Sequence, residues 1–518
     1  MNRKLKQFTE VLNSQSYLHK RSLFGLFLAI LLIDRIVALV NFGFVYTDID
    51  QTVLWNGLLD YSQGIFPEPF FYGQPYNYML ESLVAVPLYW MNIPVYIAMP
   101  MTTSCIVLLP FIILAFLFFK TKNPFWAFLT LALPVLLPVE FNFLTSLSRG
   151  FVQAFLFLPL LYIPLFYPQK KGSVTLLYIT SALCFIANQS SALFIAPVFL
   201  FVFSYHYKSL LFYIKALLVL PILFLDYLAK EFYTSHSERI VHPHANVGFS
   251  LDTFWESLKT YDHFENLFPF FSSWGIVYPL LFILLAVIGY RKSLIKEALF
   301  SAVAFLMLMV TFAIPKVQER HDEADIFFTP SRLFIVLPIL LIISLFIIFK
   351  KSKNAYRLTL PLLALTVVFM ILKNNHLDRK IDHILDGNIF PSVKNETLVT
   401  RALHLNKIAL KNDVDLIVHA NMNGYEYILD SYAFNPIVYH SRKGEKKIIS
   451  VNLYGDRRTW LYSSSLPSRQ ILLSGFKIDS NLLKPFDHEI ISDEEIVIKN
   501  NNLSTQELFS RFNLEFKI

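Results

Sequence analysis

One feature recurs along most of this chain: windows of mainly apolar residues, separated by shorter polar segments. A helix of about 20 apolar residues crosses the hydrocarbon core of a bilayer, so each window predicts a transmembrane span. Of the 518 residues, 55% are hydrophobic and only 16% are charged, which is too apolar for a soluble protein of this length. We therefore expect an all-α polytopic membrane bundle with about 11 transmembrane helices, near residues 22–46, 93–119, 124–140, 150–167, 173–188, 191–207, 209–228, 274–290, 296–314, 331–349 and 356–373.

Lysine and arginine are distributed unevenly between the two sides of this bundle. Counted over alternate polar segments from the N-terminus, one side holds 17 of them and the other about six, while residues 47–78 hold none. Basic residues concentrate in the cytoplasmic loops of membrane proteins. The pattern predicts a cytoplasmic N-terminus and a retained first span, and an odd number of spans then places the residues after Lys373 outside the cytoplasm. The formal charge of +7 reflects this asymmetry and does not indicate nucleic-acid binding.

The apolar windows stop near residue 373, where the composition changes. Beyond it, short β-type runs, namely VDLIVHA, PIVYH, KIISVNLY and EIISDEEIVIK, alternate with helical patterns such as LVTRALHLNKIALK. About 145 residues suffice for a small domain with its own core. We expect a transmembrane domain at 1–373, with outer loops at 47–92, 229–273 and 315–330, and a soluble extracytoplasmic α/β domain at 374–518.

Several kinds of chemistry find no support in the sequence. The two cysteines, Cys105 and Cys184, both lie inside apolar windows, so neither a disulfide framework nor a thiolate zinc site is expected. No phosphate-binding glycine loop, dinucleotide fingerprint or nucleophile elbow occurs. Reactions driven by ATP or by a dinucleotide cofactor are therefore not indicated.

The first outer loop begins YTDIDQTVLWNGLLDYSQG and carries acids but no bases. Its QTVLWNGLLDYSQG stretch predicts an amphipathic helix on the membrane surface, ended by Gly64, and YMLESLVAVPLYW predicts a second one. Asp48 and Asp50 then stand at the start of the first helix, either as capping acids or as catalytic ones. Glu81 lies among apolar neighbours in the second helix, where a carboxylate is costly unless it is used.

This loop resembles the first outer loop of the GT-C-fold glycosyltransferases, above all their protein-mannosyltransferase-like and bacterial lipid-sugar-dependent members. Those loops have an Asp-Glu-Ala pattern about fourteen residues before a glycine, then a YGQ-Y stretch and a Leu-Glu-Ala element. Here Asp50 lies fourteen residues before Gly64, YGQPY follows, and Leu-Glu-Ser stands at 80–82. Gln51 replaces the family's glutamate, and Asp48 is an additional acid. The resemblance extends less specifically to LSRGFVQAFLFLPLLY, NQSSALFIAPVFLFV and FFTPSRLFIVLPILLI. Residues 374–518 carry no motif that we assign to a family.

The resemblance implies transfer of a monosaccharide from a polyprenyl-phosphate carrier to an acceptor on the outer face, with inversion at the anomeric carbon. The acceptor hydroxyl must lose a proton, so a carboxylate is needed as general base. Asp50 is the first candidate for this base and Asp48 the second, with Glu81 as a further catalytic candidate.

The leaving phosphate needs fixed positive charge nearby. Arg332 and Arg149 each stand at the outer end of an apolar window and are the main candidates to bind the donor phosphate; Arg320 and Lys316 are candidates from the third outer loop. The alternative for either of the first two is an arginine whose charge simply reaches the membrane interface.

A divalent cation, Mg²⁺ or Mn²⁺, is a further possibility. His236, His242 and His244 gather in the second outer loop and, with Asp48, are candidate metal ligands. The alternative interpretation is that these three histidines are ordinary surface residues of an irregular loop.

Other functions compete with this hypothesis. A flippase or transporter of lipid-linked sugars predicts charges along a path at mid-membrane, where only Asp34 and Arg35 qualify. A polysaccharide polymerase or ligase would share the substrate but more often has a large late loop rich in arginine and histidine. A binding protein would have a pocket in the C-terminal domain. The partners that we expect are a polyprenyl-phosphate-sugar donor, membrane lipid and a protein, glycolipid or glycan acceptor, in the inner membrane of a bacterium with the C-terminal domain periplasmic or extracellular.

Overall fold

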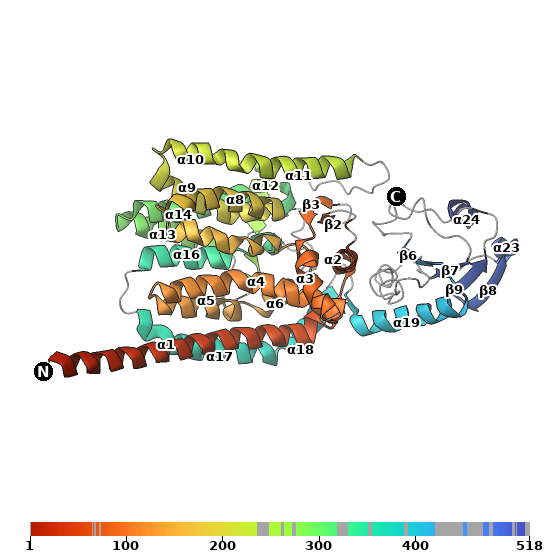
Figure 1. Ribbon diagram of the computed structural model, residues 1–518, viewed down its shortest axis with the longest axis horizontal. Coiled ribbons are helices and arrows are strands. Elements are labelled where there is room, and N and C mark those ends of the chain that lie inside the picture. The colour runs from red at the N-terminus through yellow and green to blue at the C-terminus, as the bar shows by residue number, and fades with distance from the viewer. Residues whose placement is uncertain are drawn as a thin grey trace.

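The structure is a computed structural model in which helices lie side by side in a bundle and a small sheet lies beyond one end of it (Figure 1). It describes residues 2–64, 66, 69–71, 74–235, 248–260, 264–271, 276–318, 330–350, 355–387, 392–419, 449–452, 470–475, 480–499, 503 and 505–512. The beginning of α1 and the C-terminal sheet lie at opposite ends of the bundle (Figure 1).

The bundle is built from apolar helices that pack around a single large hydrophobic core. Its helices are α1 (Asn2–Ala38), α4 (Val95–Lys120), α5 (Pro124–Leu136), α6 (Val139–Leu144), α7 (Tyr162–Phe166), α8 (Lys171–Ala187), α9 (Ala192–His206), α10 (Leu210–Lys215), α11 (Val219–Thr234), α13 (Val277–Arg291), α14 (Ile295–Thr311), α16 (Leu337–Phe349) and α17 (Thr359–Asn375).

Within the part of the chain that is described, five segments are long and apolar enough to cross a membrane: His19–Gly43, Val95–Lys120, Gln189–His206, Leu210–Tyr233 and Tyr356–Asn375. Shorter apolar helices complete the bundle: α5 packs on α1, α4 and α17, whereas α13 and α16 pack on each other and on α14. The chain is a multi-pass integral membrane protein. The full count of about 11 spans, and the domain boundary at residue 373, stay predictions.

The window at 150–167 is not one continuous helix. It forms two 3-10 turns, Gln153–Leu156 and Leu158–Leu161, followed by α7. Pro159 and Pro164 explain the breaks, because proline has no backbone N–H to donate and its ring clashes with the preceding turn. The residues just before these turns, Ser148–Val152, form an irregular segment and no helix.

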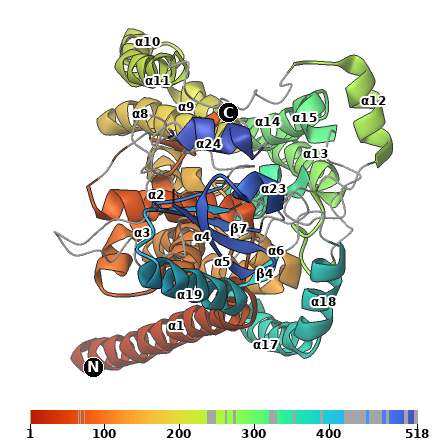
Figure 2. The ribbon, with the colours of Figure 1, turned by 90° about the vertical axis from the view of Figure 1, so that its right-hand side faces the viewer.

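At the end of the bundle that faces the sheet, the first outer loop folds into α2 (Ile49–Ser62), the hairpin β2 (Phe70–Phe71) and β3 (Gln74–Tyr78), and α3 (Leu80–Trp90). Figure 2 views this end directly. Residues 51–61 of α2 are all buried, so α2 is a packed helix and not the amphipathic surface helix that we expected. It packs on α3 and α4, and its Trp55 and Leu58 belong to a hydrophobic cluster that also includes Leu398 and Ala402 of α19 (Asn395–Lys411).

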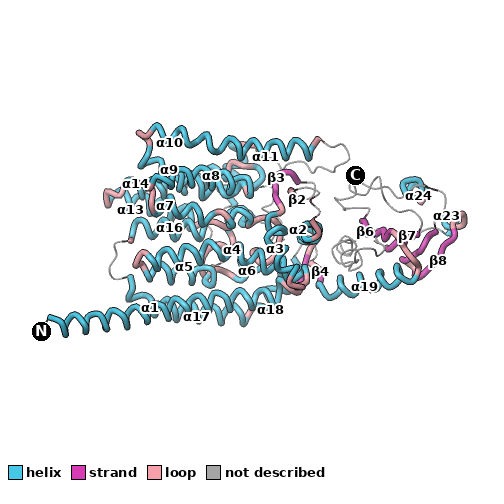
Figure 3. Tube along the Cα trace, viewed as in Figure 1, coloured by secondary structure: helices cyan, strands magenta, loops and turns pink. Residues whose placement is uncertain are grey.

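The C-terminal region forms a five-stranded mixed sheet in the order β6-β5-β7-β9-β8 (Figure 3, magenta). β5 (Leu416–His419), β6 (Ile449–Asn452) and β7 (Gln470–Ser474) are parallel, while β9 (Glu495–Lys499) is antiparallel to β7 and to β8 (Asp487–Ser492). The remaining described helices are α12 (Leu251–Thr260), α15 (Pro315–Gln318), α18 (Leu377–Gly387), α23 (Ser480–Leu483) and α24 (Thr505–Arg511).

Candidate functional site

The two aspartates of the first loop stand at the beginning of α2. Asp48 is the N-cap: its backbone is extended and its Oδ1 accepts from the backbone N–H of Gln51 at 3.0 Å. This is the capping role for which aspartate is favoured, because it satisfies a donor that the helix leaves unpaired. Asp50 lies in the first helical turn, where the helix dipole favours an acid. The capping alternative therefore describes Asp48 but not Asp50.

Arg149 joins the two aspartates from a segment about 100 residues later. Its Nε lies 3.0 Å from Asp48 Oδ2, and its Nη2 lies 3.3 Å from Asp50 Oδ2. The side chains of Arg149 and Asp48 are 0% and 1% exposed, whereas that of Asp50 is 22% exposed. Of these three charged groups, only the Asp50 carboxylate is open enough to meet a substrate.

Glu81 contacts the residue that follows Arg149, namely Gly150. Glu81 is fully buried at the start of α3, and its Oε1 accepts from the backbone N–H of Gly150 at 3.0 Å. The Thr103 hydroxyl of α4 donates to Glu81 Oε2 and is also 2.6 Å from the Ser148 hydroxyl. Burial raises the pKa of Glu81 to about 7, against the lowering effect of these two hydrogen bonds.

Gly150 is required by the shape of this segment. Its φ of +79° is in the left-handed region, which glycine tolerates and other residues rarely adopt. A Cβ at this position would lie 2.8 Å from Asn77 Oδ1 and 2.9 Å from Asn77 Cγ. Asn77 in turn accepts from Gln153 Nε2 at 3.1 Å, so the hairpin, the segment and the following turn are packed together.

Phe151 brings the second arginine to the site. The guanidinium carbon of Arg332 lies 5.0 Å from the centre of the Phe151 ring, and that of Arg149 lies 5.9 Å from it. Both are cation–π distances. Arg332 belongs to the 3-10 turn Pro330–Phe334 that precedes α16, and is 8% exposed.

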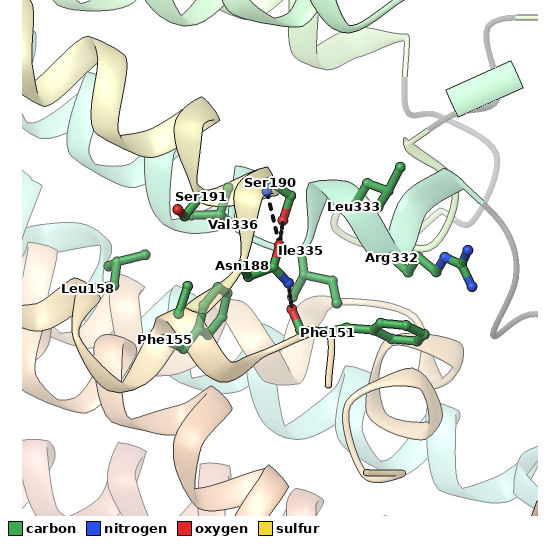
Figure 4. Close-up of a pocket in the computed structure, with 11 residues that line it drawn as sticks. Phe151, Phe155, Leu158, Asn188, Ser190, Ser191, Arg332, Leu333, Ile335 and Val336 are labelled. Carbon is green, nitrogen blue, oxygen red and sulfur yellow. Dashed lines mark hydrogen bonds between the residues drawn. The ribbon is translucent and has the colours of Figure 1, made fainter. Parts of the chain in front are cut away.

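A pocket opens beside this ring, between the turn that carries Arg332 and the broken window at 150–167. Figure 4 shows Phe151 and Arg332 at one end of the pocket, and Phe155 and Leu158 at the other. Asn188 Nδ2 donates to the Phe151 carbonyl at 2.7 Å and fixes the wall between them. The pocket thus has a charged end and an apolar end.

The segment Ser148–Phe151 therefore contacts candidate site residues from several distant parts of the sequence. Each of its four residues makes a contact that builds the site: Ser148 with Thr103, Arg149 with the aspartates, Gly150 with Glu81, and Phe151 with Arg332. The sequence analysis named none of Thr103, Ser148 and Phe151 as site residues, although Ser148 and Phe151 flank Arg149 and Gly150 in the stretch LSRGFVQAFLFLPLLY.

Gln51, the departure from the family pattern, is fully buried, and its Oε1 accepts from the Ser148 N–H at 3.3 Å. It thus contributes to this segment as a neutral residue. Lys316 lies in α15, which contacts the turn of Arg332. Arg320, His236, His242 and His244 lie outside the described residues.

A metal ion is a poor fit to the residues that are described. The Asp48 and Asp50 carboxylates already face the guanidinium of Arg149, whose charge would repel a cation at the same oxygens. Within the described ranges, no three His, Cys, Asp or Glu side chains are grouped so as to hold a metal. We therefore derive no catalytic step through a metal.

Comparison with known proteins gives the class of fold. Neither a protein-family model nor a curated protein matches the sequence. The arrangement of the helices is that of the GT-C fold, which confirms the resemblance seen in the first outer loop at the level of the fold. The solved structure that carries this match is ArnT from Cupriavidus metallidurans in the apo state. The alignment covers 92% of this chain and 97% of that one, with a TM-score of 0.50 and 12% sequence identity.

Proposed function

We propose that the protein is an integral membrane glycosyltransferase that moves a monosaccharide from a polyprenyl-phosphate carrier to an acceptor on the extracytoplasmic face. The observation that carries the proposal is the juxtaposition of a partly exposed carboxylate, Asp50, with two arginines, Arg149 and Arg332, around one aromatic ring. The fold shared with ArnT supports the same class of reaction.

Asp50 acts as the general base. The acceptor hydroxyl gives its proton to the Asp50 carboxylate while its oxygen forms a bond to the anomeric carbon. Asp48 is 1% exposed and caps α2, and Glu81 is enclosed by Thr103 and Gly150, so neither is placed to receive this proton. These two acids hold the site in shape, and Asp50 performs the proton transfer.

The carrier phosphate leaves with the electron pair of the broken bond between its oxygen and the anomeric carbon. Its negative charge is met by Arg332, because a guanidinium group binds phosphate oxygens through paired N–H donors. Arg149 is 0% exposed and already faces Asp48 and Asp50, so it adds positive charge behind the base without contacting the phosphate. Hydroxyl and phosphate stand on opposite sides of the sugar, so the single displacement inverts the anomeric carbon.

The charges at mid-membrane argue against the flippase alternative. Lys373 Nζ lies 2.8 Å from Asp34 Oδ1, and Arg35 donates to Thr145 Oγ1 at 2.8 Å and to the Asn142 carbonyl at 3.2 Å. All of these side chains are buried in helix contacts. They join α1, α6 and α17 and do not line a translocation path.

In this proposal residues 1–373 carry the reaction, and residues 374–518 form an extracytoplasmic domain. The N-terminus is cytoplasmic and the membrane is the inner membrane of a bacterium. The acceptor is a protein, a glycolipid or a polysaccharide.

The test is to incubate the purified protein with a panel of polyprenyl-phosphate sugars and candidate acceptors, and to measure release of the carrier phosphate. Asp50→Asn should abolish turnover and leave donor binding intact, whereas Arg332→Ala should weaken donor binding. Asp48→Asn keeps the cap of α2, because asparagine caps a helix as well as aspartate does, but it removes the charge that faces Arg149, so its turnover should fall less than that of Asp50→Asn. Full turnover in the Asp50 variant, combined with loss in the Asp48 variant, would move the base to Asp48. Full turnover in both would refute the mechanism.

A further inference from the structure

The chain immediately before Asp48 is held by residues that follow the last membrane helix. The short strand β1 (Tyr46–Thr47) pairs antiparallel with β4 (Val393–Lys394). The backbone N–H of Asn395 donates to the Val45 carbonyl at 2.8 Å, and its side-chain Nδ2 donates to the Phe44 carbonyl at 2.8 Å. Asn395 is only 3% exposed. One residue, 351 positions away from Phe44, thus satisfies two consecutive carbonyls.

The helix that begins at Asn395 connects this point to the C-terminal sheet. In the first half of α19, Leu398 and Ala402 are buried in the cluster that contains Trp55 of α2. In its second half, Leu405 and Ile408 are buried against Ile417 and Leu472 of the sheet. Figure 1 shows α19 extending from α2 and α3 to the strands. A single helix therefore contributes both to the cluster that buries the helix with the candidate base and to the C-terminal core.

The other wall of the site is held from the same region of the chain. Lys373 donates to Asp34 at 2.9 Å and to the Val135 carbonyl at 3.1 Å, and Lys380 of α18 pairs with Glu140 of α6 at 2.5 Å. The short helix α6 is fully buried and leads directly into the segment Ser148–Phe151. The arginine-bearing segment and the aspartate-bearing helix are thus both anchored to residues 373–402.

We propose that Asn395 is a positioning residue for the transfer reaction, and that β4 and α19 couple the C-terminal sheet to the membrane site so that the two act as one unit. The inference rests on the proposed function, because it assigns to Asn395 the placement of Asp50 relative to Arg149. Asn395 fixes the carbonyls of residues 44 and 45, β1 follows directly, and Asp48 then caps α2. A shift of β1 therefore displaces the carboxylates that Arg149 contacts.

Asn395→Leu tests this directly, because leucine has nearly the same size and removes the donor to Phe44. We expect kcat to fall about tenfold or more, with the KM for the donor within about twofold, since misplacing a reacting group weakens the transition state more than substrate binding. Asn406→Leu is the matched control on the same helix. Asn406 is 5% exposed, and within the described residues neither of its side-chain polar atoms has a hydrogen-bond partner. Its kcat should be unchanged.

A cross-link separates loss of positioning from loss of folding. Tyr46 and Lys394 are directly opposite in the β1–β4 pair, and facing residues of antiparallel strands are about 4.5–5.5 Å apart at Cα, within the range of a disulfide. Adding Tyr46→Cys and Lys394→Cys to the Asn395→Leu chain should restore at least half of the wild-type kcat when oxidised, and not when reduced. The same cysteine pair in the otherwise unchanged chain should keep its turnover.

Three results would overturn the inference: wild-type kcat in Asn395→Leu, a low kcat that persists once the cross-link has formed, or loss of turnover when the unchanged chain is cross-linked. An unchanged chain without transferase activity in any donor and acceptor combination would instead refute the proposed function, so the two failures are distinguishable.

Discussion

Replacing Gly150 with alanine should damage the site through one added methyl group. Gly150 has φ +79° and supplies the N–H that Glu81 accepts. A Cβ at this position would meet Asn77 Oδ1 at 2.8 Å and Cγ at 2.9 Å, and Nδ2 at a still shorter distance. Asn77 is held by a hydrogen bond from Gln153, which also accepts from the Leu80 N–H at 2.9 Å. Either the Asn77 amide gives up its hydrogen bond or the segment that carries Arg149 moves, and both disturb the packing of this segment.

Two costs contribute to the expected effect. A left-handed backbone costs an L-residue about 1–2 kcal/mol. Overpacking a well-packed region costs about 1–3 kcal/mol more. The free energy of unfolding should therefore fall by about 2–5 kcal/mol in Gly150→Ala. A displacement of about 1 Å at Arg149 would in addition lower kcat about 100-fold, because catalysis depends on sub-ångström placement.

Gly64→Ala is the matched control. Its φ of +75° carries the same backbone cost, but nothing lies within 4 Å of the added Cβ. The free energy of unfolding of Gly64→Ala should therefore fall only by the backbone cost of about 1–2 kcal/mol, and its kcat should be unchanged. In the double variant Gly150→Ala/Asn77→Ala, removal of the Asn77 amide should recover the packing contribution.

The assays are thermal unfolding in detergent and release of the carrier phosphate from a polyprenyl-phosphate sugar. If Gly150→Ala and Gly64→Ala have equal Tm and equal kcat, then Asn77 does not constrain the segment and the reasoning is wrong. The same holds if the double variant recovers nothing relative to Gly150→Ala.

Three other predictions follow from the charged groups. Burial raises the pKa of Glu81 from 4.5 to about 7, so the Tm of the wild-type chain should fall relative to Glu81→Gln as the pH rises from about 4.5 to about 7, where the buried carboxyl ionises. Burial, with a smaller effect of the Arg401 charge, lowers the pKa of His419 from 6.5 to about 3. Hydrogen exchange in β5 and β7 should therefore accelerate as the pH falls from about 6.5 to about 3, after correction for the intrinsic rate, and less so in His419→Asn. Arg149→Lys should lower kcat at least about tenfold, because one ammonium cannot reproduce the two directed contacts to Asp48 and Asp50.

Much of the fold follows from local pattern. Helix α3 lies where YMLESLVAVPLYW predicted it, and the structure has β5 and β6 at VDLIVHA and KIISVNLY. The run EIISDEEIVIK is divided between the end of β8 and β9, and PIVYH lies outside the described residues. Strand β7 was not predicted, although QILLS has the apolar content of a buried strand. Helix α2 was expected on the membrane surface and is buried. It packs on α3 and α4, and Leu398 and Ala402 of α19, more than 300 residues later in the chain, belong to the same hydrophobic cluster.

The sequence by itself determined that the chain crosses a membrane several times and that it has a GT-C-like first outer loop. It also identified the candidate catalytic acids Asp48, Asp50 and Glu81 and the candidate phosphate-binding residues Arg149 and Arg332. Hydropathy and charge act residue by residue, so they can be read along the chain. Only the tertiary structure decided how these residues divide the work. It made Asp48 a buried cap, left Asp50 partly exposed, and gathered both around Arg149. The physical reason is that Ser148 and Gln51, whose hydrogen bond helps to bring the two segments together, are 97 residues apart, and no local pattern encodes such a contact.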